Sequence, residues 1–262
     1  MLRSVFGKTL WDQRRSLPVW SLAIAAVMTL YASFYPSSRA SAAQSLASMP
    51  AAFRQAFALG QIATAPGYLQ ATVFNFIGPL LLLLFVATAG ARAIAGDEEA
   101  GTLDLLLAHP VGRVEVVVQR FAALAVATGV VCAAVLLGLV AVARPAQIDI
   151  PAGDLAAMAL HFALLGLCFG AVSLAIGAVT GRRAAALGGT AAIAVLSYFA
   201  NTLAPQQRAT EWLERLSAFS YYAGGQPLQH GVQIGGAAVL VVATIALVAV
   251  GTFAFVRRDV SA

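Results

Sequence analysis

The chain has 262 residues, of which 60% are hydrophobic and only 10% are charged, and its formal net charge is +5. Soluble globular domains have about 25% charged residues, so this composition excludes a protein whose surface mostly faces water. The basic residues lie between apolar blocks and do not form one patch, which gives no support to nucleic-acid binding.

Residues 2–16 are the first predicted element, an amphipathic helix. Leu2, Phe6 and Leu10 fall on one helical face, and most of the basic residues lie elsewhere. Such a helix lies in the membrane interface, with its cations at the level of the lipid headgroups. A plain basic flank that follows the positive-inside rule explains the same pattern equally well.

Six apolar blocks are each long enough to cross a bilayer, which takes about 20 helical residues. A secretory signal fits the first block less well, because the apolar run is long for a signal peptide. We therefore predict an all-α integral membrane protein, a six-transmembrane-helix bundle that forms a single transmembrane domain over residues 1–262. The predicted spans are residues 17–35, 71–95, 114–143, 155–180, 184–203 and 232–256.

An even number of spans places both termini on the same side of the membrane. If that side is the cytoplasm, 11 of the 16 basic residues lie inside and the remaining five lie outside. Cytoplasmic segments carry an excess of Lys and Arg, so we predict cytoplasmic termini. The richness in Ala and Arg is typical of GC-rich bacterial genomes, so we expect the membrane to be a bacterial inner membrane. The inside set is Arg3, Lys8, Arg14, Arg15, Arg92, Arg113, Arg120, Arg182, Arg183, Arg257 and Arg258.

The cytoplasmic loop at residues 97–109 is predicted to be a short helix. Acidic residues begin it, where the helix dipole favours negative charge, a leucine stripe follows on one face, and Pro110 ends it. A solvated loop has no need of such a stripe, so we expect it to contact a groove on another protein. A helix packed beneath its own bundle is the alternative. The predicted contact residues are Asp97, Glu98, Glu99, Gly101, Thr102, Leu103, Leu106, Leu107 and Arg113.

Residues 205–231 form a second distinctive segment, on the predicted outer side. A short helix is followed there by a turn-rich stretch with aromatic residues. This composition suits an interfacial or re-entrant element that other parts of the protein cover, and a lid over the outer mouth is one role for it. A plain structural turn is the simpler interpretation. The residues of this element are Tyr221, Tyr222, Gly224, Gly225 and Pro227.

The spans contain few polar groups. A role in helix packing explains each of them as well as a role in a transport pathway, because such side chains hydrogen-bond within and between helices. The scarcity of carboxylates at membrane depth argues against coupling to an ion gradient. A secondary transporter or channel, and a membrane assembly protein without transport, stay open as alternatives. The candidate pathway-lining residues are Asn75, Thr72, Thr128, His161 and Ser173.

The chain has no evident chemistry of its own. Gly7-Lys8-Thr9 is similar to the end of a P-loop, but Leu2 stands where the first glycine is required. Cys132 and Cys168 lie inside apolar blocks without metal-ligand spacing. We therefore predict that the chain is not an enzyme and has no catalytic residue, no cofactor and no metal.

The pattern E-E-x-G-T-L-x-L-L-L-x-x-P-V-x-R, from Glu98 to Arg113, resembles the permease subunits of type 2 ABC (ABC-2) exporters. The run from Tyr221 to Leu228, and a final span that ends in Arg257-Arg258-Asp259, are similar to the same family. Gly112 departs from the family, whose members often have Ser there, and it removes a cap for the third span. The resemblance covers essentially the whole chain.

The resemblance implies a permease subunit that forms the pathway of an ATP-driven exporter. Two permeases, identical or paralogous, would pair with two ATP-binding subunits that carry the ATP and Mg. Residues 98–109 would be the coupling helix seated in a groove on the ATP-binding subunit, and residues 2–16 the connecting helix at the membrane surface. A pathway lined by apolar and small residues suits amphiphilic compounds such as drugs, antibiotics or lipids.

Overall fold

The computed structural model describes residues 4–47, 64–102, 111–203 and 211–258. Over this part of the chain the regular structure is helical, without a strand. The predicted all-α membrane bundle is confirmed, because six helical stretches in the described residues are long and apolar enough to cross a bilayer. They are Ser16–Ser41, Ala65–Glu99, Arg113–Ala143, Ala152–Thr180, Arg183–Thr202 and Ile234–Arg257.

The first half of the bundle contains two of these stretches, each built from several elements. The N-terminal elements are α1 (Val5–Gln13), α2 (Ser16–Ser33) and α3 (Tyr35–Ala47). The second stretch contains α5 (Ala65–Leu69), the π-helix η2 (Gln70–Ile77), α6 (Gly78–Ala91), the π-helix η3 (Arg92–Gly96) and α7 (Asp97–Glu99).

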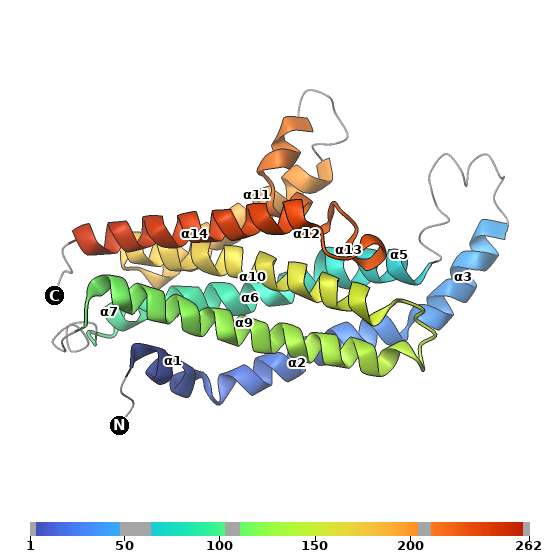
Figure 1. The fold of residues 1–262 in the computed structure, drawn as a ribbon, viewed down its shortest axis with the longest axis horizontal. Helices are drawn as coiled ribbons and strands as arrows, with labels where there is room; N and C mark the ends of the chain where they lie inside the picture. The colour runs from blue at the N-terminus through green and yellow to red at the C-terminus, as the bar shows by residue number, and fades with distance from the viewer. Residues whose placement is uncertain (1–3, 48–63, 103–110, 204–210, 259–262) are drawn as a thin grey trace.

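The described residues of the second half form four long helices and three short ones. The long helices are α9 (Arg113–Ala143), α10 (Ala152–Thr180), α11 (Arg183–Leu203) and α14 (Ile234–Arg257). Between α11 and α14 lie the 3₁₀-helix η5 (Glu211–Leu216), α12 (Ala218–Ala223) and α13 (Pro227–His230). In Figure 1, α1 and the C-terminal end of α14 lie at the same end of the bundle, which we call the terminal end.

The helix α10 lies at the centre of the bundle and contacts α6, α9, α11 and α14. In its most apolar stretch 72% of the residues are buried, compared with 17% in α11. Glycines allow the close approach, because a Cβ on Gly90 of α6 would lie 2.7 Å from the carbonyl oxygen of Gly170. Similarly, a Cβ on Gly251 of α14 would lie 2.9 Å from the Cα of Ala175.

A wider helical turn precedes Pro79 in the second stretch. Proline has no N–H to donate, and its ring collides with the carbonyl four residues earlier, which is that of Asn75. The π-helical turns of η2 end directly before this position and accommodate both effects. Towards the end of the bundle opposite the terminal end, the rings of Phe74 and Phe162 pack edge to face with their centroids 5.9 Å apart.

Candidate functional site

The three consecutive acidic residues of α7 contact three different helices at the terminal end. The Asp97 carboxylate forms an ion pair with Arg120 of α9. Glu98 forms another with Arg258, the residue that follows α14. Glu99 accepts a hydrogen bond at Oε1 from the backbone N–H of Arg183, the first residue of α11, over 2.8 Å. We call these residues, 97–99, the acidic segment.

The position of the acidic segment differs from the one expected. The sequence suggested the start of a helix, but the residues lie at the end of the helical stretch Ala65–Glu99. A helix C-terminus disfavours negative charge. Arg120 and Arg258 therefore compensate two things, the charge of the carboxylates and the negative end of the helix dipole. The Glu99 carboxylate is stabilised in addition by α11, because it lies at the N-terminus of that helix, where the helix dipole favours negative charge.

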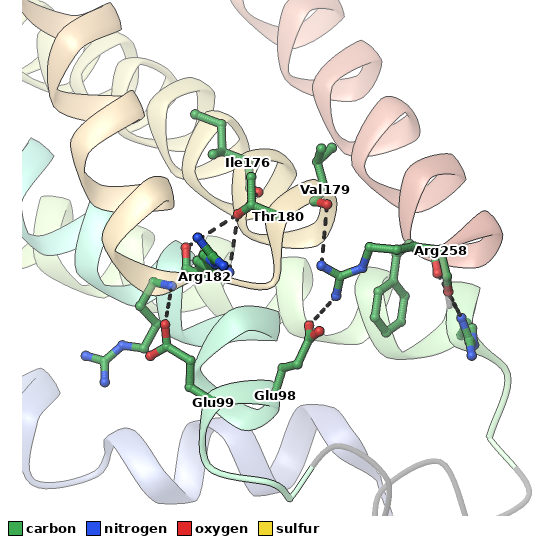
Figure 2. A network of polar contacts seen from close by, with 10 residues as sticks. Glu98, Glu99, Ile176, Val179, Thr180, Arg182 and Arg258 are labelled. Atoms are coloured by element: carbon green, nitrogen blue, oxygen red, sulfur yellow. Dashed lines mark hydrogen bonds and ion pairs between the residues drawn. The ribbon is translucent and has the colours of Figure 1, made fainter. Parts of the chain in front are cut away.

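Gly181 makes room for the ion pair between Glu98 and Arg258. Its backbone is left-handed, with φ of +66°, and it terminates α10. A Cβ at this position would lie 2.5 Å from both Arg258 Nη1 and Glu98 Oε1. Arg258 also donates from Nη1 to the carbonyl of Val179 over 3.4 Å, so the end of α10 belongs to the same network (Figure 2).

Arg113 holds the C-terminal end of α14. Its Nη1 donates to the carbonyl oxygens of Phe255, over 3.1 Å, and of Arg258, over 2.7 Å. Its guanidinium carbon also lies 5.6 Å from the centre of the Phe255 ring. The guanidinium therefore contacts the chain's own helix end. Gly112 precedes it as an N-cap without a side-chain hydrogen bond.

The helix expected over residues 97–109 is interrupted soon after it begins. Gly101 takes a left-handed φ of +65°, and its N–H donates to the carbonyl of Glu98 over 3.0 Å. The N–H of Thr102 then donates to the carbonyl of Asp97 over 2.9 Å, which closes the turn. The remaining predicted contact residues, Leu103, Leu106 and Leu107, lie outside the described residues.

The hydroxyls of three candidate pathway residues donate to backbone carbonyls. Thr72 and Thr128 bond to carbonyls one turn earlier in their own helices, over 2.7 and 2.9 Å. Ser173 of α10 bonds across to Ala87 of α6 over 2.7 Å. These hydroxyls therefore take part in helix structure and helix packing.

His161 and Asn75 lie in different surroundings. The His161 ring is fully buried, and its Nε2 accepts the N–H of Gln233 at the start of α14 over 3.1 Å. Asn75 is exposed, and its side-chain oxygen accepts a hydrogen bond from Gln70 over 2.9 Å. The structure thus places the two residues apart, His161 inside the bundle and Asn75 on its surface.

Asn75 belongs to the lining of an apolar groove between η2, α6 and α11. The groove has a volume of about 260 Å³. Aliphatic and aromatic side chains make up nearly all of its wall, which contains Phe76, Pro79, Leu80, Leu83, Ala194, Val195, Tyr198, Phe199 and Phe219.

The turn-rich element predicted near residue 221 packs into the bundle. Tyr222 is only 1% exposed, and its hydroxyl donates to the carbonyl of Phe74 over 3.0 Å. Burial raises the pKa of the Tyr222 phenol well above its ordinary value, which keeps this donor protonated. The Tyr221 hydroxyl donates to the carbonyl of Arg215 over 2.8 Å, and Pro227 begins α13. Gly224 ends α12, and the side chain of Gln233 covers Gly225.

The sequence prediction missed the partners of the acidic segment. Arg120, Arg183 and Arg258 carry this network, together with Gly181. A signal was available, because three adjacent carboxylates at one end of an apolar bundle require compensating charge from other helix ends. Each of these arginines lies in a segment assigned to the same side of the membrane by charge distribution.

The family model described as "ABC-2 family transporter protein" matches residues 3–260. No match is found among curated proteins. The matched residues include all six candidate spans and the whole acidic segment.

Proposed function

Because this chain belongs to the ABC-2 transporter family, we propose that it is the permease of an ATP-driven exporter and that its acidic segment couples it to a separate ATP-binding subunit. The observation that carries the proposal is that three adjacent carboxylates each contact a different helix, α9 two turns from its start and α11 and α14 at their ends. A displacement of this short segment would reach α9, α11 and α14 together.

The coupling is proposed to run from the leucine stripe to the acidic segment. Leu103, Leu106 and Leu107, which follow Glu99 by four to eight residues in the sequence, would lie in a groove on the ATP-binding subunit. When the ATP-binding subunits close on ATP, they would push this segment. The ion pairs of Asp97 and Glu98 would transmit the push, since they link α7 to α9 and to the end of α14. Helix ends that shift together are a recognised route from a local contact to a global change.

The complex is proposed to contain two copies of the ATP-binding subunit, which would bind the ATP and Mg, and two permeases. The second permease would be either a copy of this chain or a paralogue. The exposed apolar face of α11 supports such pairing, because Leu196 is 68% exposed and Phe199 52%. We further propose a bacterial inner membrane, with both termini in the cytoplasm.

The exported compounds are proposed to be amphiphilic, such as drugs, antibiotics or lipids. The apolar groove supports this assignment, because aliphatic and aromatic walls with one amide at Asn75 suit a ligand that is mostly apolar and has one polar group. The groove lies beside the exposed face of α11, so a second permease placed there would enclose it.

Reconstitution into liposomes tests the proposal against an ion-driven carrier. We expect the chain together with its ATP-binding subunit to move an amphiphilic dye only when ATP and Mg are present on the side of that subunit. Liposomes that contain the chain alone, under a proton or sodium gradient, should show no transport. Gradient-driven transport by the chain alone would contradict the proposal and favour a secondary carrier.

A further inference from the structure

Two adjoining cavities lie between α1 and the body of the bundle at the terminal end. The first, of about 300 Å³, reaches from α1 to η3, α9 and the start of α11. The second, of about 130 Å³, lies between the junction of α1 with α2 and the face of α6. The two share four lining residues and so form one continuous trough. The shared residues are Gln13, Ser16, Ala89 and Arg92.

The first cavity is polar and has more positive than negative groups. Arg92, Arg120 and Arg183 line it together with Asp12 and Asp97, which leaves one net positive charge. Asp97 already pairs with Arg120, so two arginines face the trough against one exposed aspartate. Arg92 is exposed and Arg183 is half-buried, and both line the cavity. Their guanidinium groups are therefore the donors that an anion in the trough would meet.

The second cavity is bordered by aromatic rings that lie along the spans. Trp20 of α2 and Phe85 of α6 line it, with their ring centroids 5.9 Å apart. The trough thus changes from arginines near α1 to aromatic rings deeper along the bundle. An inorganic anion would use only the first part, whereas a lipid has an anionic phosphate and an apolar chain in the same order.

The helix α1 lies at the mouth of the trough and has the character of an interfacial helix. Its Trp11 is 55% exposed, and the guanidinium of Arg14 lies 4.1 Å from the centre of the indole ring. Indole and guanidinium groups of this kind are typical of the level of the lipid headgroups. A phosphate at the same level would reach the arginines of the trough without entering the bundle core.

We propose that this trough binds one anionic phospholipid, with its phosphate against Arg92 and Arg183 and the first part of an acyl chain along Trp20 and Phe85. Guanidinium groups bind phosphate oxygens in a fixed, often bidentate geometry, and basic pockets between helices bind anionic headgroups. The bound lipid links α1 to α6 and α11. The proposal holds for either orientation of the chain and does not require ATP-driven transport.

Trp20 is a built-in reporter for this lipid. The chain has three tryptophans, so a Trp11→Phe/Trp212→Phe background leaves Trp20 as the only one. In nanodiscs of phosphatidylcholine, a small fraction of phosphatidylglycerol with brominated chains should quench Trp20 more strongly than the same fraction of brominated phosphatidylcholine. Each arginine near a charged headgroup strengthens binding by about fivefold, so Arg92→Gln/Arg183→Gln should remove most of this preference.

Arg182→Gln is the matched control, because Arg182 is the exposed neighbour of Arg183 and does not line the trough. It should retain the preference. Should the double variant fail to fold, Ala89→Leu tests the same site, since it fills the part common to both cavities without changing a charge. Equal quenching by both lipids, or a preference that survives Ala89→Leu, would overturn the proposal. If glycerol phosphate at millimolar concentration abolished the quenching difference, the ligand would be a free phosphate ester and the lipid assignment would fail.

Discussion

Arg120 is a guanidinium held inside a membrane bundle, only 8% exposed at the terminal end of α9. Its charge is tolerable there because Asp97 faces it. Removal of one partner from such a pair leaves the other charge without compensation, whereas removal of both costs much less. The ion pair therefore has a structural role that is separable from any role in transport.

We predict that Asp97→Asn lowers the free energy of unfolding by about 1–3 kcal/mol, the cost of an unsatisfied buried group. The lower part of that range applies, because the Asp97 side chain is 25% exposed and water reaches it. Thermal unfolding in detergent measures the change. Asp97→Asn combined with Arg120→Met should recover most of the loss, and Asp12→Asn, at an exposed position, should have no effect. Unfolding of Asp97→Asn at the wild-type temperature would show that the pair contributes nothing.

At the level of single residues, the sequence predicted the position of the acidic residues but not their partners. Three adjacent carboxylates in an apolar chain are conspicuous, and so their importance was evident. Their partners Arg120, Arg183 and Arg258 lie 23, 84 and 160 residues away in the chain. No periodicity connects positions so far apart, because only the packing of the helices brings them together.

Among the elements, α10 depends on small residues where neighbouring helices cross it. Gly251 of α14 lies directly against Ala175, with no space for a methyl group. Gly129 of α9 is a glycine in a similar long helix, but a Cβ there would meet nothing within 4 Å. The two positions therefore separate helix packing from helix propensity.

We predict that Gly251→Ala destabilises the bundle by about 1–3 kcal/mol, the usual cost of overpacking. Gly129→Ala should be neutral or stabilising, because alanine favours the helix by about 1 kcal/mol over glycine. Thermal unfolding of the two variants side by side gives the comparison. Equal changes in the unfolding temperature of the two variants would mean that α14 does not approach α10 as closely as described.

Hydropathy predicted six spans, the number found in the described residues, but not their interruptions. The second stretch begins at Ala65, six residues before the predicted start, because Thr64 caps it and Pro66 follows in its first turn. The π-helical turns of η2 and η3 left no signal in the apolar pattern, although Pro79 marked the position of the first. Helix ends depend on single capping contacts, which an average over 20 residues does not detect.

In the whole molecule, the two ends of the bundle are built differently. The terminal end is held by ion pairs and by hydrogen bonds to helix ends, around the acidic segment. The opposite end is held by packed aromatic rings, among them Phe74, Phe162 and Tyr222. The contacts at the two ends therefore differ in kind, mainly charged at the terminal end and aromatic at the opposite end.

The topology is open to a direct labelling test. We predict that a membrane-impermeant maleimide labels Thr102→Cys only from the cytoplasmic side and Asp149→Cys only from the outer side. Both positions are exposed. The native Cys132 and Cys168 are 4% and 6% exposed, so background labelling should be low. The wild-type chain is the control, and labelling of both variants from one side would contradict the six-span topology.

The measurement that tests the coupling role most directly is the amount of substrate transported per ATP hydrolysed, in liposomes that contain the complete transporter. Glu98→Gln removes the ion pair with Arg258, while Glu115→Gln makes the same change at an exposed position on α9. Both variants should co-purify with the ATP-binding subunit as the wild type does. We predict that a transporter with Glu98→Gln hydrolyses ATP at the wild-type rate but transports at least about fivefold less substrate per ATP, a loss in the range of typical coupling energies. A ratio equal to that of Glu115→Gln and the wild type would contradict the account.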